Sequence, residues 1–113
     1  GIGIKKMVSL IEQSIIDLLA DYSISSHKIS GAPGVYVDGS KIAALGLKVR
    51  HGRTYHGLSL NIDMDLSPYK LINPSGFKDL NVTQMSNLTD NILELSKIKK
   101  QLNHHLSNYV TRT

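Results

Sequence analysis

Residues 35–50 read VYVDGSKIAALGLKVR, and they contain the clearest strand and turn signals in the chain. Val35 to Val37 is β-branched and aromatic, which is typical of a strand. Asp38-Gly39 follows with the two residue types that a type I′ hairpin turn prefers. Lys41 to Arg50 continues as the partner strand, which is expected to place Ile42, Ala44 and Gly46 on one face and Ala43, Leu45, Leu47 and Val49 on the other. A strand that is apolar on both faces predicts a central position in a sheet.

Further strands are predicted on both sides of this hairpin. His27 to Ile29 predicts a short strand, and Gly31-Ala32-Pro33-Gly34 predicts a loop because its two glycines flank a proline. After a His51-Gly52 turn, residues 54–63 predict another strand, in which Leu58, Leu60 and Ile62 alternate with Gly57, Ser59 and Asn61. The prolines between residues 64 and 77 predict a connecting segment, with a tight turn at Asn73-Pro74-Ser75-Gly76.

Amphipathic helices are predicted near both ends of the chain. In residues 5–21 the apolar side chains recur at helical spacing, and the polar side is expected to hold Glu12, Gln13, Ser14 and Asp17. Thr89 is the expected N-cap of the last helix, with Asp90 in its first turn. The apolar stripe of that helix is expected to comprise Leu88, Ile92, Leu95, Ile98, Leu102 and Leu106. This order of elements predicts an α+β domain with a mixed or antiparallel sheet flanked by helices.

Length and composition limit the classes of function. The chain has 113 residues, which suits a single domain over 1–113, and it has no cysteine. Disulfides, thiolate zinc sites and a cysteine nucleophile are therefore excluded. No membrane span is expected, because the sequence lacks a run of about 18 apolar residues.

The net charge of +4 permits either nucleic acid or an acidic protein as partner. Five tyrosines and one phenylalanine are too few for a base-stacking platform, so no nucleic-acid partner is expected. The five histidines do not have the spacing of a metal site. His104 and His105 are adjacent and would lie on different sides of a helix, so no metal site is predicted.

Two residues are candidates for chemistry. Lys41 opens an otherwise apolar strand, where an amine that loses solvent becomes a usable base. The alternative is a plain strand-end lysine after an Asp-Gly turn. Ser75 lies in a Pro-Ser-Gly turn that can present its hydroxyl, and the alternative is an ordinary turn serine. These residues alone leave both alternatives open.

Four ordered blocks resemble the octanoyltransferases of lipoate biosynthesis. They are APGVYV at 32–37, KIAALGLKVR at 41–50, HGLSLNIDMDLSP at 56–68 and INPSGF at 72–77. The flanking helices also lie where that family has them. The resemblance implies a partial version of the lipoate/biotin protein ligase-like catalytic domain, namely its C-terminal part, without the N-terminal half that the family has.

The resemblance implies a reaction in two acyl-transfer steps. The family moves an octanoyl group from acyl carrier protein onto a cysteine, and then onto a lysine of a lipoyl domain, with a second lysine as base. Lys41 matches the family's base, and Ser75 stands where the family has its cysteine. The stretches that match the acyl pocket comprise Ala44, Leu45, Gly46, Gly57, Leu58 and Ser59.

The resemblance also implies partners and a compartment. The partners are octanoyl-acyl carrier protein and the lipoyl domains of 2-oxoacid dehydrogenases and of the glycine cleavage H protein, in the cytoplasm. No cofactor and no metal are implied, because the acyl donor arrives already activated.

Two departures from the family pattern modify these expectations. A serine hydroxyl is far less ionised than a thiol, so an impaired or inactive transferase is expected. Without the N-terminal half, the sheet is expected to expose an edge and an apolar face, which favours self-association. Two other readings are a non-catalytic module that docks acyl carrier protein or a lipoyl domain through Lys48, Arg50 and Arg53, and a degenerate remnant without activity.

Overall fold

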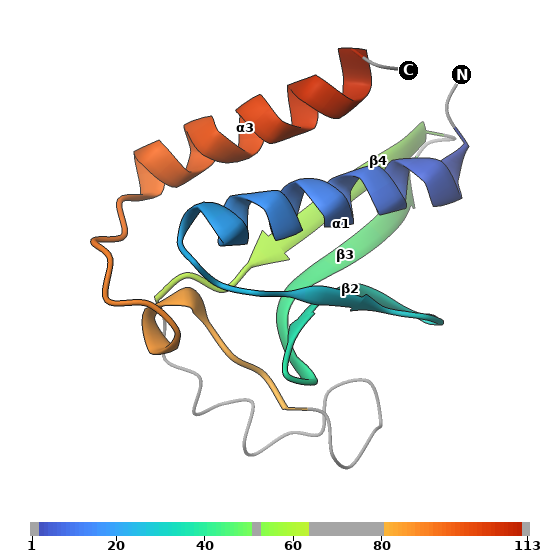
Figure 1. The fold of residues 1–113 in the computed structure, drawn as a ribbon. Helices are drawn as coiled ribbons and strands as arrows, with labels where there is room; N and C mark the ends of the chain where they lie inside the picture. Colours follow the sequence, from blue (N-terminus) through green and yellow to red (C-terminus); the bar gives the residue numbers. More distant parts are fainter. Residues whose placement is uncertain (1–2, 51–52, 64–80, 112–113) are drawn as a thin grey trace.

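The computed structural model describes residues 3–50, 53–63 and 81–111 (Figure 1). Its elements are α1 (Ile4–Asp21), β1 (His27–Ile29), β2 (Ala32–Val37), β3 (Ser40–Arg50), β4 (Arg53–Leu60), the 3₁₀ turn η2 (Met85–Asn87) and α3 (Leu95–Thr111). The strands form an antiparallel sheet of four in the order β1-β2-β3-β4. The predicted α+β class is therefore confirmed.

The hairpin between β2 and β3 has the predicted turn. Asp38 and Gly39 both have positive φ angles, 50° and 83°, as a type I′ turn requires. β3 lies between β2 and β4, so its predicted central position is also confirmed. The hairpin thus carries Lys41 into the interior of the sheet, at the start of its longest strand.

Both helices lie on one side of the sheet (Figure 1). α1 packs on the strands and α3 runs alongside α1. The core between them comprises Ile15, Leu18, Leu19, Tyr22, Ile24, Val35, Val37, Ile42, Ala43, Met85 and Ile98. None of the described helices is long and apolar enough to cross a membrane.

A β-bulge interrupts β3 next to Lys41. Tyr36 pairs with Lys41 and Val35 pairs with Ala43, so Ile42 is an extra residue in β3. Ile42 and Ala43 are both fully buried in the same core, whereas Ala44 is exposed. The prediction that Ile42 and Ala44 share a face is therefore wrong, because the extra residue breaks the strict alternation of the strand.

The boundaries of two other predicted strand segments also differ. β2 already begins at Ala32, which pairs with Ile29, so the predicted loop over 31–34 is shorter than expected. The pairing confines the turn to residues 30–31, and Gly31 takes a positive φ of 77° there. β4 ends at Leu60 rather than at Asp63. The predicted turns at 51–52 and 73–76 lie outside the described residues.

The polar side of α1 is less exposed than predicted. Glu12 and Ser14 are 8% and 0% exposed, because α1 is covered by the sheet on one side and by α3 on another. The Ser14 hydroxyl donates to the Leu10 carbonyl oxygen at 2.8 Å, so its burial leaves no unsatisfied donor. The Glu12 carboxylate reaches the sheet, where it accepts a hydrogen bond from the Gly34 N–H.

The last helix begins later than predicted. α3 starts at Leu95, and Thr89 instead accepts a hydrogen bond from the Asn91 N–H at 3.2 Å in a local turn. Of the predicted apolar stripe, Ile98 is buried at 2% exposure, while Ile92, before the helix, is 83% exposed. Leu88 and Leu95 are also exposed, at 37% and 56%, whereas Leu102 packs against the core beside Ile98.

Candidate functional site

The Lys41 side chain lies across two residues of β2. Tyr36 is its direct partner in the β2–β3 ladder, and Lys41 Nζ lies 6.0 Å from the centre of the Tyr36 ring. A Cβ atom built at Gly34 would be 2.9 Å from Lys41 Cε and 3.7 Å from Nζ. The Lys41 amino group is therefore held near an aromatic ring, on the side of the sheet opposite Val35 and Val37.

Gly34 makes room for this lysine. Its φ of +135° is a conformation that side-chain-bearing residues rarely adopt, and a Cβ atom there would also be 2.7 Å from the Ala43 carbonyl oxygen. Glycine is needed at this position for both reasons. The sequence motif Ala-Pro-Gly in β2 thus has a local structural explanation.

The backbone of Lys41 is fixed on its other side by residues 81–83. The Lys41 N–H donates to the Asn81 carbonyl oxygen at 2.8 Å, and the Lys41 carbonyl oxygen accepts from the Thr83 N–H at 2.8 Å. The neighbouring Ile42 carbonyl oxygen accepts from the Asn61 N–H at 2.9 Å. Both flanks of segment 64–80 are therefore attached beside Lys41.

Ser75 belongs to that segment and lies outside the described residues. The predicted pairing of Lys41 with Ser75 accordingly stays a prediction.

Tyr36 gives this site an uncharged, buried wall. Its side chain is 2% exposed, and its hydroxyl donates to the Ala32 carbonyl oxygen at 3.2 Å. Burial, and secondly the negative charge of Glu12, raise the pKa of the Tyr36 phenol above its ordinary value of 10.0. His27 of β1 stacks on the same ring with centroids 6.3 Å apart. The phenol is therefore neutral at physiological pH.

The predicted pocket residues are direct partners across β3 and β4. Ala44 pairs with Ser59, Leu45 with Leu58 and Gly46 with Gly57. Ala44 and Ser59 are both exposed, whereas Leu45 packs against the core. Alternation then places Ala44 and its partner Ser59 on the face that carries Lys41, as a row of small exposed residues. Leu45 lies on the opposite face, and the role of the six residues as an acyl pocket stays a prediction.

Glu12 is a site neighbour that sequence reasoning missed. Its Oε2 accepts a hydrogen bond from the buried Gly34 N–H at 2.9 Å. The signal was available, because Ile15, Ile16 and Leu19 follow Glu12 at i+3, i+4 and i+7 and place it on the apolar stripe. A charged residue on such a stripe requires a polar partner in the core.

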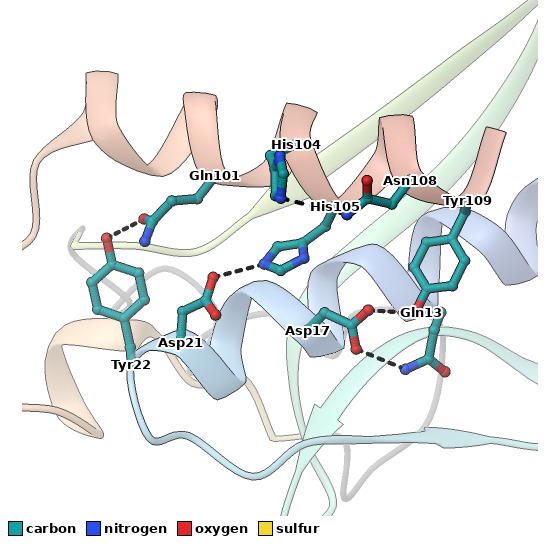
Figure 2. A network of polar contacts seen from close by, with 9 residues as sticks. All are labelled: Gln13, Asp17, Asp21, Tyr22, Gln101, His104, His105, Asn108 and Tyr109. Carbon is teal, nitrogen blue, oxygen red and sulfur yellow. Dashed lines mark hydrogen bonds and ion pairs between the residues drawn. The ribbon is translucent and has the colours of Figure 1, made fainter. Parts of the chain in front are cut away.

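Polar side chains form a network between α1 and α3, which Figure 2 shows. The Tyr22 hydroxyl donates to Gln101 Oε1 at 2.6 Å, and the Tyr109 hydroxyl donates to Asp17. His105 Nε2 lies 2.7 Å from Asp21 Oδ2. Gln13 and Asp17 bond to each other within α1 at 3.1 Å. These contacts hold the helices together on the side of the molecule away from Lys41.

The network includes His105, one of the two adjacent histidines of α3. His105 pairs with Asp21, while His104 approaches Asn108 Nδ2 at 3.4 Å on the outer side of α3. The adjacent histidines thus have different partners. Within residues 3–50, 53–63 and 81–111, no group of three His, Asp or Glu residues could hold a metal ion.

Comparison with known families gives one match over nearly the whole chain. Residues 1–107 match the family described as the lipoyl protein ligase A/B catalytic domain. The chain is 57% identical over 112 residues to an octanoyltransferase of Vesicomyosocius okutanii, covering 99% of this chain and 55% of that protein. It is 52% identical over 109 residues to an octanoyltransferase of Chromobacterium violaceum, covering 94% and 53%. The chain therefore spans about half the length of these curated relatives.

Solved structures with a similar fold are much more distant in sequence. A biotin protein ligase from Aquifex aeolicus superposes with a TM-score of 0.71 at 13% identity, covering 94% of this chain and 45% of the ligase. LipL1 of P. falciparum in complex with lipoate superposes with a TM-score of 0.68 at 13% identity, covering 99% and 32%. The fold is accordingly that of a partial ligase-like catalytic domain, as the sequence predicted.

Proposed function

Because this chain belongs to the lipoyl protein ligase A/B catalytic domain family, we propose that it acts in octanoyl transfer for lipoate biosynthesis. The donor is octanoyl-acyl carrier protein, and the acceptor is a lysine of a lipoyl domain. Two relatives that are called octanoyltransferases, at 57% and 52% identity, support this reaction class.

One observation about Lys41 carries the proposal. Its side chain extends over Gly34 beside the neutral Tyr36, on the face where the small residues Ala44 and Ser59 are exposed. Those small residues leave room for a linear acyl chain and let it approach the backbone. An amine at the start of such a row is well placed to act as a base on a bound thioester.

The proposed reaction has two steps. In the first, Ser75 Oγ attacks the thioester carbonyl carbon while Lys41 accepts the hydroxyl proton. The carbon–sulfur bond breaks, and the thiol of acyl carrier protein leaves with that proton. In the second, the acceptor lysine amine attacks the oxyester, an amide forms, and the proton released from the amine returns to Ser75 Oγ through Lys41.

Serine at this position makes the first step slow. A free thiol is already about a few per cent thiolate at neutral pH, whereas a serine hydroxyl needs a base to remove its proton during the attack. An oxyester is also a less reactive acyl donor toward an amine than a thioester. We therefore expect weak activity in the native chain.

Intact-mass spectrometry of the acyl-enzyme tests the proposal. The native chain and its Ser75→Cys and Ser75→Ala variants are each incubated with octanoyl-acyl carrier protein. We expect the Ser75→Cys variant to gain one octanoyl group fastest, the native chain to gain it more slowly, and the Ser75→Ala variant to gain none.

The curated relatives are about twice as long as this chain, so one further assay supplies the part that they have in addition. The Ser75→Cys variant is also assayed together with the N-terminal half of a curated octanoyltransferase. If the Ser75→Cys variant forms no octanoyl adduct, either alone or together with that N-terminal half, the proposed transferase function is wrong.

A docking function is a second candidate, and the β3–β4 hairpin supports it. Arg50 and Arg53 are direct partners in the ladder, and Lys48 pairs with Tyr55 nearby. The positive charges of these residues are complementary to an acidic partner, which in this proposal is acyl carrier protein or a lipoyl domain.

Binding measurements separate this second candidate from catalysis. Calorimetric titration with apo acyl carrier protein should show binding that weakens with added salt and with Arg50→Ser plus Arg53→Ser. Binding without any adduct on the Ser75→Cys variant would favour the docking function over the transferase function.

Self-association is a further expectation that the strand order supports. β1 and β4 are the two outer strands of the described sheet, so each has one strand neighbour. A second copy could pair with such an edge. Light scattering at micromolar concentration tests this, and a monomer mass would contradict it.

A further inference from the structure

Glu12 is a buried carboxylate that connects the first helix to the sheet. Its side chain is 8% exposed, and its Oε2 accepts the Gly34 N–H at 2.9 Å, across 22 residues of sequence. A carboxylate is costly to bury unless it is hydrogen-bonded, and a bond to an ionised acceptor is stronger than one between neutral groups. The Glu12–Gly34 contact is therefore a specific attachment between α1 and β2.

Gly34 lies in an irregular part of β2. His27 pairs with Tyr36 and Ile29 pairs with Ala32, so β2 has extra residues between these two pairs. Pro33 has no N–H, and the N–H of Gly34 is used by Glu12 rather than by a regular ladder. Glu12 thus defines the position of β2 where the strand pairing defines it least.

This irregular part of β2 is also the surface under the Lys41 side chain. The Cβ position of Gly34 is 2.9 Å from Lys41 Cε, closer than real Cβ contacts, so the backbone of Gly34 limits where the lysine can lie. A shift of Gly34 would open space beneath Lys41 or push against it. Through Gly34, the position of Lys41 depends on a residue of α1.

We infer that Glu12 is a positioning residue for Lys41, which acts by accepting the Gly34 N–H and thereby holding the backbone on which the lysine side chain rests. That this positioning serves catalysis rests on the proposed function, in which Lys41 is the base. That Glu12 fixes the position of Lys41 does not depend on acyl transfer.

The electrostatics of Tyr36 support the same arrangement. The Glu12 charge raises the pKa of the Tyr36 phenol, after burial, and Tyr36 is the ladder partner of Lys41. Glu12 is therefore close enough to influence the second residue that flanks the lysine. Gly34 and Tyr36, the two residues beneath Lys41, both interact with this one carboxylate.

Nuclear magnetic resonance of the labelled full chain tests the inference. The readouts are the exchange rate of the Gly34 amide and the Overhauser contact between the Lys41 ε-methylene and the Gly34 α-protons. We compare the native chain with Glu12→Ala, which removes the acceptor, and with Glu12→Gln, whose amide oxygen can still accept the Gly34 N–H. Gln13→Ala is the matched control, since it removes a neighbouring α1 hydrogen bond that ends on Asp17 rather than on the sheet.

We expect Glu12→Ala to lose the slow exchange of the Gly34 amide and the Lys41–Gly34 contact, and Glu12→Gln to keep both. In Glu12→Ala the Gly34 amide should exchange roughly fivefold to tenfold faster. The contact between Lys41 and Gly34 should disappear in the same variant. Glu12→Gln and Gln13→Ala should keep both signals. A purely structural role for Glu12 would lower stability and leave the Lys41–Gly34 contact in place.

Three results would overturn the inference. One is an unchanged Lys41–Gly34 contact in Glu12→Ala. Another is a loss of that contact in Glu12→Gln that equals the loss in Glu12→Ala. If Glu12→Ala does not fold, the native chain still decides, because a Gly34 amide that exchanges as fast as in an unstructured peptide contradicts the bond. None of these readouts needs acyl transfer, so failure of the octanoyl-adduct experiment is a separate result.

Discussion

The ε-carbon of Lys41 occupies the space in which a side chain at Gly34 would begin. A Cβ atom at Gly34 would lie 2.9 Å from that carbon and 2.7 Å from the Ala43 carbonyl oxygen. A flexible lysine could move away, but a backbone oxygen could not. The glycine therefore determines both how closely β2 approaches β3 and where the proposed base lies.

Substitution of Gly34 by alanine should destabilise the fold strongly. The new Cβ would strain a φ of +135° and collide with backbone, and we expect a loss of about 2–4 kcal/mol in unfolding free energy. Urea denaturation measures it. Gly31→Ala is the matched control, since its φ is +77° but nothing lies within 4 Å of the added Cβ. It should cost about 1 kcal/mol, and equal losses in both variants would contradict the collision.

Replacement of Lys41 should slow formation of the acyl-enzyme strongly. In the Ser75→Cys background, Lys41→Gln removes the proposed base while keeping a long polar side chain. We expect adduct formation to slow by about 10²–10⁴-fold, the usual contribution of a general base. Lys28→Gln is the control, because Lys28 is exposed and bonds to Ser9 of α1. A rate that falls equally in both variants would argue against a specific role for Lys41.

Tyr22 should make stability depend on alkaline pH. Burial, then the charges of Asp21 and Glu94, raise its pKa above 10.0, so the folded chain favours the neutral phenol. This contribution to stability is complete below pH 10 and is lost as the pH rises through the raised folded-state pKa. Tyr22→Phe should be less stable by about 0.5–1.5 kcal/mol at pH 7, since it loses the bond to Gln101.

The difference between native and Tyr22→Phe should then shrink as the pH is raised above 10. Urea denaturation from pH 7 to pH 11 measures both chains. A difference that is constant over this range would show that Tyr22 does not titrate as its surroundings predict.

The adjacent histidines of α3 should differ in their effect on stability. His105 contacts Asp21 with a side chain that is 20% exposed, whereas His104 points to the outer side of α3. We expect His105→Ala to lower the unfolding free energy by about 0.5–1 kcal/mol. His104→Ala should change it by less than about 0.5 kcal/mol. Thermal unfolding at low and high salt measures both, and a larger effect at His104 would contradict the helix orientation.

The later start of α3 predicts a contrast between two isoleucines. Ile98 is 2% exposed in the core, so Ile98→Ala should cost about 2–4 kcal/mol. Ile92 is 83% exposed before the helix, so Ile92→Ala should stay within about 0.5 kcal/mol. If both substitutions cost the same, the helix stripe would begin before Leu95, as the sequence pattern suggested.

Local sequence signals were sufficient for the elements and for the lysine. The Asp38-Gly39 turn, the apolar strand after it and the helical spacing in 5–21 each depend on neighbours in the chain, and the structure has all three. Lys41 was prominent for the same reason, since it interrupts an apolar strand pattern. The partners Ala44–Ser59 and Gly46–Gly57 follow from the predicted strands once the register of β3 and β4 is known.

Contacts between distant segments decided what the sequence pattern could not. The bulge at Ile42 depends on how β2 pairs with β3, and it places two consecutive residues in one core. The burial of Glu12 depends on β2, whose Gly34 N–H donates to its carboxylate, and helical spacing alone predicts neither this contact nor the full burial of Ser14. Neighbouring residues in the sequence are enough to predict the strands, the first helix and the candidate base. The apolar stripe of α1 indicates that Glu12 needs a polar partner, but the folded chain alone identifies that partner as the Gly34 N–H beneath the candidate base, because the two residues lie 22 positions apart.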